Sequence, residues 1–295
     1  MNNTILTIQN EKLTVQINQA GAELWSIKTN DNCEYLWQGD AAYWSDRAIN
    51  LFPYIARMTD KSYTYEGQLY HMDIHGFAKD SMFEVTEQTA DSLTLKISST
   101  EATLAQYPFA FDFYIIYQLT GDTLNVSFRV LNKDTKTMYF AAGGHPGFNV
   151  PLEAGLSFED YYVEFSTPCD AKRVVFSEDC FVIDGAFDPF TLPENNRYQL
   201  AHNMFDDDAI ILTAMPRQIQ LGSDKGTKKV IVTYPEMDYL GLWHMPHTDA
   251  PYICIEPWTS LPSRKGIVEA LETQENLLNL VAGGEYINTW SIQII

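Results

Sequence analysis

Four short segments of the chain combine ionisable side chains with glycine or proline, which restrict the backbone to defined turns or stiff extended stretches. In chain order they carry Arg57 in LFPYIARMTD, His71 and His75 in HMDIHGFAKD, His145 in GGHPGFNV, and Glu256 in YICIEPWTS. An imidazole, a carboxylate and a guanidinium could together supply an acid, a base and anchors for hydroxyl oxygens. The segments lie far apart in sequence, so this chemistry depends on a fold that brings them together.

His145 stands between Gly144 and Pro146 in a stretch that cannot be helical, because proline disfavours the helical conformation of the residue before it. We expect a stiff, irregular segment next to a strand that holds the imidazole in place. The near-neutral pKa of histidine suits acid and base catalysis. A lone histidine in a turn is, however, most often a hydrogen-bonded structural residue.

Glu256 follows the apolar run from Tyr252 to Ile255 and precedes Pro257 and Trp258. The sequence therefore predicts a carboxylate at the end of a buried strand, where desolvation raises its pKa unless a cation or a donor compensates. Such a carboxylate is a usable base near neutral pH. The alternative is a glutamate on a solvated strand edge, or one paired with an arginine for structural reasons.

The four segments gain significance when they are considered jointly, since acid, base and hydroxyl anchors are all present. Trp243 and Trp258 add flat faces that suit the apolar side of a sugar ring. The set therefore resembles a carbohydrate site. Taken singly, Arg57 could be only a salt-bridge partner, and His75 with Gly76 could be only a turn.

Most of the chain shows the period-2 alternation of half-buried strands. Clear runs lie at residues 13–17, 93–97, 124–130 and 290–294. Helical periodicity is confined to residues 101–106 and 272–280, the second with Thr273 as a cap. Many short strands and few helices predict an all-β fold, a large antiparallel β-sandwich with few short helices. No linker or repeat divides the chain, so we expect one domain over residues 1–295.

Composition narrows the classes of function. The 295 residues include 39 acidic and 19 basic ones, a formal net charge of −20, which argues against nucleic acid as a partner and favours solubility. The N-terminus lacks a signal sequence, and no apolar run is long enough to span a membrane, so we expect a cytoplasmic protein with no membrane partner. The four cysteines lack zinc-site spacing and are expected to be reduced thiols.

The motifs HGFAKD, GGHPGFNVPL and CIEPW, in this order after LFP and an arginine, resemble those of the aldose 1-epimerase (galactose mutarotase) family, and most closely its LacX-like branch. The resemblance extends to the turn at Gly284. It implies a galactose mutarotase-like supersandwich. Two positions depart from the family's usual pattern, with Ala56 in place of a glycine and Lys79 in place of an arginine.

The resemblance also implies roles for residues at matching positions. His145 corresponds to the general acid and Glu256 to the general base, while His75 and Arg57 correspond to sugar-binding residues. An aspartate before an apolar strand holds hydroxyls, and among Asp206, Asp207 and Asp208 we choose Asp207 for its spacing to the strand. Trp243 completes the predicted substrate-binding residues.

The implied reaction interconverts the α and β anomers of a free hexose by acid–base ring opening. It needs no cofactor and no metal, and its partner is a small-molecule sugar; the protein is expected to be a monomer or a homodimer. With His145 protonated and Glu256 ionised in the free enzyme, kcat/KM should have a bell-shaped pH dependence.

Three alternatives remain open at this point. One is a hexose-phosphate 1-epimerase that uses Arg57, Lys61 and Lys79 to bind phosphate. Another is a non-catalytic carbohydrate-binding protein on the same fold. The third is a metal site, whose candidate ligands are His71, His75, His145, His244 and His247.

Overall fold

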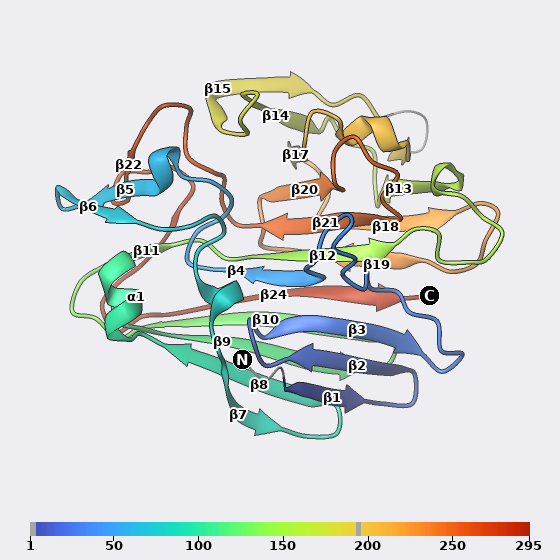
Figure 1. Ribbon diagram of the computed structural model, residues 1–295, viewed down its shortest axis with the longest axis horizontal. Coiled ribbons are helices and arrows are strands. Elements are labelled where there is room, and N and C mark those ends of the chain that lie inside the picture. The colour runs from blue at the N-terminus through green and yellow to red at the C-terminus, as the bar shows by residue number, and fades with distance from the viewer. Residues whose placement is uncertain (1–3, 193–195) are drawn as a thin grey trace.

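The computed structural model describes residues 4–192 and 196–295, and most of the described chain is β-strand. Figure 1 shows long strands running across the molecule, with helix α1 (Glu101–Gln106) at one end. Within the described ranges, α1 is the one α-helix. Short 3-10 turns lie at Thr59–Lys61, Ala78–Asp80, Phe158–Asp160 and His202–Phe205.

The largest sheet has nine strands and contains most of the alternating segments. Its order is β16 (Arg197–Gln199), β13 (Tyr161–Phe165), β18 (Gln218–Ser223), β19 (Val230–Thr233), β24 (Glu285–Ile294), β10 (Thr123–Asn132), β9 (Phe111–Thr120), β8 (Ser92–Ser98) and β7 (Glu84–Gln88).

A second sheet has seven strands and carries the chemistry-bearing segments. Its order is β15 (Val182–Pro189), β14 (Lys172–Phe176), β17 (Ile210–Thr213), β20 (Tyr239–Trp243), β21 (Tyr252–Trp258), β12 (Gly143–Asn149) and β4 (Ala48–Leu51).

Three small sheets complete the fold. They are β1 (Ile5–Gln9), β2 (Leu13–Asn18) and β3 (Glu23–Thr29); β11 (Met138–Phe140) with β23 (Leu278–Leu280); and β22 (Glu269–Ala270), β5 (Ser62–Tyr65) and β6 (Gln68–His71). Among the described strands, β22 pairs with β5 in parallel and the other pairs are antiparallel.

One hydrophobic core joins the two large sheets. Along β10 every second residue is buried, and the core includes Val126 and Phe128 from this strand together with Ile253 and Ile255 from β21. Strand β21 differs from β10 because all of its residues are buried. Its other face carries Cys254, Glu256 and Trp258, so a second covered surface lies outside the main core.

The predicted strands are confirmed as β2, β8, β10 and the end of β24, and the predicted helix at residues 101–106 is α1. The helix predicted at 272–280 is wrong. Turns occupy its first half, Asn276 takes a left-handed φ of 71°, and Leu278–Leu280 pairs with β11 as β23. Sheet pairing thus overrides the local helical pattern.

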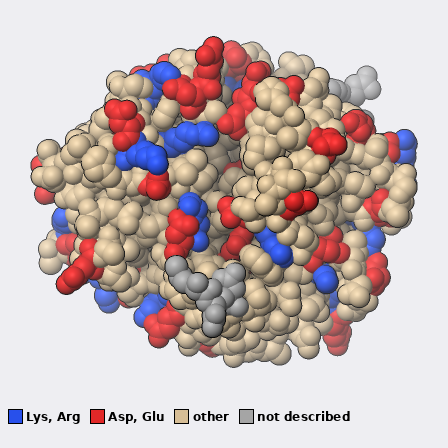
Figure 2. Space-filling view, viewed as in Figure 1, with Lys and Arg blue, Asp and Glu red and all other residues tan. Residues whose placement is uncertain are grey.

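No helix among the described residues is both long and apolar enough to cross a membrane. On the face drawn in Figure 2, acidic side chains are spread widely, with basic ones between them. Residues 1–3 of the N-terminal stretch examined for a signal lie outside the described residues. The cytoplasmic location, the absence of a nucleic acid partner and the division into one domain stay predictions.

Candidate active site

A cavity of about 410 Å³ opens on the outer face of the seven-stranded sheet. Its volume lies in the range of ordinary small-molecule sites, about 300–1,000 Å³. Five of the residues proposed from sequence line it, namely Arg57, His75, His145, Trp243 and Glu256. The structure therefore brings together all four chemistry-bearing segments.

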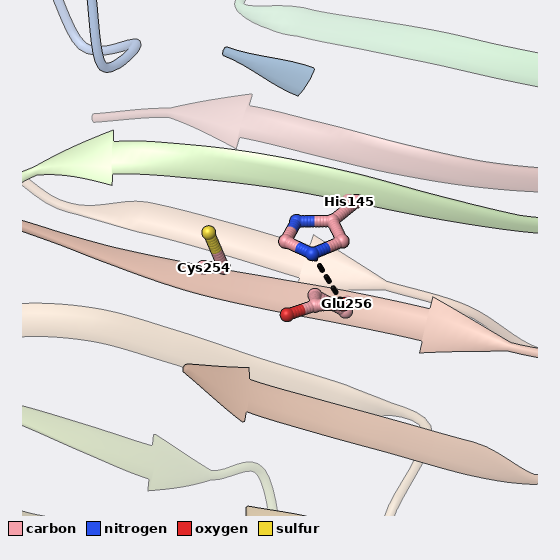
Figure 3. Close-up of side chains that lie close together, drawn as sticks. All are labelled: His145, Cys254 and Glu256. Carbon is pink, nitrogen blue, oxygen red and sulfur yellow. Dashed lines mark ion pairs between the residues drawn. The ribbon is translucent and has the colours of Figure 1, made fainter. Parts of the chain in front are cut away.

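His145 and Glu256 face one another across two neighbouring antiparallel strands. The register of β12 with β21 runs from Gly143 opposite Trp258 to Gly147 opposite Cys254, which places His145 directly opposite Glu256. Opposed residues project from the same face of a sheet. His145 Nε2 lies 3.2 Å from Glu256 Oε2 (Figure 3).

Close packing explains the glycine that precedes His145. A Cβ on Gly144 would lie 2.5 Å from the ring of Trp290, so a larger residue would push β12 away from β24. The irregular segment predicted around His145 is wrong, because the residue lies within strand β12. Pro146 is accommodated where the paired register of β12 with β21 is interrupted, since proline has no N–H to donate there.

Burial shifts both members of the pair toward their neutral forms. The side chains of His145 and Glu256 are 10% and 2% exposed. Desolvation lowers the pKa of His145 to about 4. Desolvation also raises the pKa of Glu256 well above its usual value, as the sequence predicted, and the charge of Asp208 adds to this rise. The ligand-free pair therefore favours neutral imidazole and protonated carboxyl, contrary to the expected charged histidine and ionised glutamate.

His75 is held in one tautomer by its neighbour. Its Nδ1 accepts a hydrogen bond from the backbone N–H of Ala56 at 3.1 Å, and its own backbone N–H donates to the Ala56 carbonyl at 3.1 Å. Because a backbone N–H can only donate, the proton of the neutral ring lies on Nε2. Desolvation, followed by the charges of His145, Lys79 and Arg57, lowers the pKa of His75 and keeps the ring neutral.

The turn that carries His75 requires glycine at the next position. His75 and Gly76 have φ values of 66° and 73°. A Cβ on Gly76 would come 2.3 Å from the carbonyl oxygen of Phe52, which accepts hydrogen bonds from Phe77 and Ala78. This contact accounts for the glycine of the HGFA motif in physical terms.

Comparisons with known proteins agree with this arrangement. The chain matches the aldose 1-epimerase family over residues 4–273. The chain belongs to the aldose 1-epimerase family. It is 33% identical to "Protein LacX, plasmid" of Lactococcus lactis subsp. lactis over 270 residues, which are 87% of this chain and 88% of that protein.

Two solved structures are similar to this chain over nearly its whole length. A galactose mutarotase-like protein from Lactobacillus casei is 31% identical, with a TM-score of 0.92 over 99% of this chain and 100% of that one. A galactose mutarotase related enzyme from Lactobacillus acidophilus is 32% identical, with a TM-score of 0.89 over 99% and 97% of the two chains. The galactose mutarotase-like sandwich predicted from the motifs is thereby confirmed.

The structure places a different aspartate in the cavity wall from the one chosen from the sequence. Asp208, rather than the exposed Asp207, lines the cavity. Asp207 was chosen for its spacing to the apolar strand, but Asp208 has a left-handed φ of 69°, so the extended backbone of β17 does not continue back to Asp207. Asp206 instead accepts a hydrogen bond from the backbone of His247.

Asp208 is oriented by two neighbours in the cavity wall. Its Oδ2 accepts a hydrogen bond from the thiol of Cys180 at 2.8 Å and lies 3.7 Å from Arg57 Nη1. The Arg57 side chain is 43% exposed, so this ion pair is weak and the guanidinium is free to meet a ligand. Cys180 carried no sequence signal because its role depends on a contact 28 positions along the chain.

Trp44 is the main cavity-lining residue that the sequence analysis did not predict. Its ring centroid lies 4.8 Å from that of His145 at an interplanar angle of 33°, and the side chain also lines the cavity. Trp243 meets the same imidazole edge-on at 5.7 Å. Trp258 closes the wall and is 3% exposed. The stretch around Trp44 lacks a motif, so its place could be found only from the fold.

The five histidines proposed as metal ligands do not gather at one point. His244 contacts His202 and the Met245 carbonyl, His71 contacts Ser62, and His247 contacts Asp206. Within the described ranges, one group of three metal-ligating side chains is present, formed by His145, Cys254 and Glu256.

Proposed function

We propose that the protein is an aldose 1-epimerase that interconverts the α and β anomers of a free aldose without a cofactor. The observation that carries this proposal is the pairing of His145 with Glu256 at 3.2 Å on the wall of a cavity of sugar-binding size. Membership of the aldose 1-epimerase family supports the same reaction class.

The reaction requires one acid and one base at the hemiacetal. Glu256 takes the proton of the anomeric hydroxyl while His145 gives a proton to the ring oxygen; the bond between C1 and the ring oxygen breaks and an aldehyde forms. Rotation about C1–C2 and closure on the other face regenerate the ring. During closure the two residues exchange roles, so no atom or proton is gained or lost.

This scheme needs one proton shared between His145 and Glu256. Two states meet the need, namely neutral imidazole with a protonated carboxyl and protonated imidazole with an ionised carboxylate. In the free protein burial favours that proton on the carboxyl. Hydrogen bonds from sugar hydroxyls to Glu256 favour the ionised carboxylate and thereby transfer the proton to His145. Substrate binding thus prepares the catalytic charge state.

The cavity wall supplies groups that could hold and orient the sugar. We assign the Nε2–H of His75 to a ring or hydroxyl oxygen, Arg57 and Asp208 to hydroxyl groups, and Trp243 to the apolar face of the ring. Orientation of a bound reactant contributes to rate in addition to proton transfer.

A neutral sugar suits the charges of the cavity better than a sugar phosphate. The two cations in its wall, Arg57 and Lys79, already lie beside the carboxylates of Asp208 and Asp80. The acidic side chains of Asp46 and Asp208 in the same wall would repel a phosphate dianion. This favours a free hexose over the hexose-phosphate alternative.

Polarimetry on freshly dissolved aldoses, each with and without the protein, tests the proposal. The panel should include epimers that differ at single hydroxyls, together with the matching 6-phosphates. We expect faster approach to anomeric equilibrium for at least one free aldose and little acceleration for its phosphate. Acceleration of the phosphates alone would favour the hexose-phosphate reaction. Sugar binding without acceleration would establish a binding protein instead.

A further inference from the structure

A buried thiol lies beside the acid–base pair. Cys254 and Glu256 are two residues apart on β21 and therefore project from the same face of the sheet. One ligating atom from each of His145, Cys254 and Glu256 lies within 4.8 Å of the others. Figure 3 shows the thiol and the carboxylate on one strand, next to the imidazole of its neighbour.

The same group contains buried polar atoms whose hydrogen-bonding capacity is not filled within the described structure. His145 Nδ1 makes no hydrogen bond there, and Glu256 Oε2 has only its ion-pair contact with His145 Nε2. The residues are only 8% and 1% exposed, and Cys254 is fully buried. Buried polar atoms are normally satisfied, so unsatisfied ones in a cavity wall indicate a place where a ligand binds.

We propose that His145, Cys254 and Glu256 bind a Zn²⁺ ion, and that this ion and the sugar exclude one another. Imidazole nitrogen, thiolate sulfur and carboxylate oxygen are the ligands that zinc prefers, and three protein ligands leave a fourth position open to the cavity. Zn–N and Zn–S bonds of about 2.0 and 2.3 Å require the three side chains to move toward a common point by up to about 1 Å.

Charge balance supports zinc at this buried position. A divalent ion with one thiolate, one carboxylate and one neutral imidazole has no net charge, which reduces the cost of burying it. On binding, the protons of the thiol and of the carboxyl leave for solvent. The imidazole nitrogen and carboxylate oxygen that move protons in the proposed reaction then coordinate the metal. The metal therefore acts as a reversible inhibitor. Inhibition rests on the proposed function, whereas metal binding does not.

Cobalt(II) is the direct probe of binding, since a thiolate ligand gives Co²⁺ a charge-transfer absorption that nitrogen and oxygen ligands do not give. We expect one equivalent of Co²⁺ to produce this band in the wild-type protein, and Zn²⁺ to abolish it by displacement. The band should be lost in Cys254→Ser and kept in Cys33→Ser, whose thiol lies elsewhere. Cys254→Ala provides a second test if the serine variant loses its circular dichroism spectrum.

The inhibition is measured separately with an aldose that the wild-type protein accepts. Zn²⁺ should slow anomer exchange, a saturating sugar should protect, and the half-inhibiting Zn²⁺ concentration should rise at least 10-fold in Cys254→Ser. Absence of the Co²⁺ band in the wild type, or its persistence in both Cys254 variants, would overturn the metal site. A normal band in a protein that accelerates no sugar would leave the metal site standing and contradict only the proposed function.

Discussion

At the scale of single residues, the contact of Trp44 with His145 has a direct catalytic consequence. The indole face lies 4.8 Å from the imidazole, close enough for a cation–π interaction whenever the ring is protonated. Such interactions contribute about 0.5–2 kcal/mol. Trp44 therefore offsets part of the desolvation that lowers the pKa of His145 to about 4.

We predict that Trp44→Leu lowers kcat by about 2- to 30-fold, as this range of energies implies. Trp44→Phe, which keeps an aromatic face, should retain most of the rate. Steady-state kinetics distinguishes this role from sugar binding, because loss of a stacking contact with the sugar raises KM. An unchanged kcat in the leucine variant, or equal losses in both variants, would contradict the interaction.

The pH dependence of kcat/KM follows from the two opposite pKa shifts. Below the pKa of about 4 for His145, both residues carry protons and no base is available. Above the raised pKa of Glu256, neither carries one and no acid is available. We predict a bell-shaped profile whose acid limb lies near pH 4. An acid limb near the ordinary histidine pKa of about 6.5 would show that burial does not determine the pKa of His145.

Asp207 and Asp208 form a matched pair for testing the cavity wall. Asp208 accepts a hydrogen bond from Cys180 and lines the cavity, whereas Asp207 is exposed. We predict that Asp208→Asn raises KM about 10-fold, because a charge-assisted hydrogen bond to a sugar hydroxyl contributes about 1.5–3 kcal/mol and the neutral one that asparagine can make contributes about 0.5–1.5 kcal/mol. Asp207→Asn should leave KM unchanged. A KM that rises in Asp207→Asn but not in Asp208→Asn would support Asp207, the residue predicted from the sequence.

At the scale of elements, the alternation of apolar and polar residues predicted strands well because one face of each strand meets the core. The prediction at His145 was wrong, because Gly and Pro indicated an irregular segment there. The strand tolerates them because Gly144 packs against Trp290 and the ladder beside Pro146 is interrupted. The prediction also failed at residues 272–280, where pairing of β23 with β11 decides the structure. Neither cause is visible in a local window.

Ala56 provides a test of backbone strain at this scale. Its φ of 55° is left-handed, a conformation that costs a residue with a Cβ about 1–2 kcal/mol. After the greater flexibility of glycine in the unfolded chain is subtracted, we predict that Ala56→Gly stabilises the protein by about 0.5–1 kcal/mol.

Urea unfolding measures the effect of Ala56→Gly. As a control of opposite sign, Ala102→Gly in α1 should destabilise by about 1 kcal/mol, because glycine is a poor helix former. A loss of stability in Ala56→Gly comparable to that of the control would show that the left-handed conformation is not strained.

At the scale of the whole molecule, the fold converts four distant segments into one cavity. Their residue types were enough to predict which segments line the cavity, because each combines an ionisable group with glycine or proline next to apolar residues. Trp44 was not predicted as a site residue, and Asp208 was only one of three candidate aspartates, since only the pairing of strands and the approach of loops place these two side chains in the cavity wall. The register of β12 with β21 determines the partner of His145.

The central claim is that His145 and Glu256 act as one unit in moving protons. The most direct measurement is NMR exchange spectroscopy between the α and β anomers of an accepted aldose, with His145→Asn, Glu256→Gln and the double variant. Each single variant should lower kcat by at least 10²-fold while the protein stays folded and binds the sugar, and the double variant should be little worse than either. Near-normal exchange in either single variant, or losses that multiply in the double variant, would contradict the account.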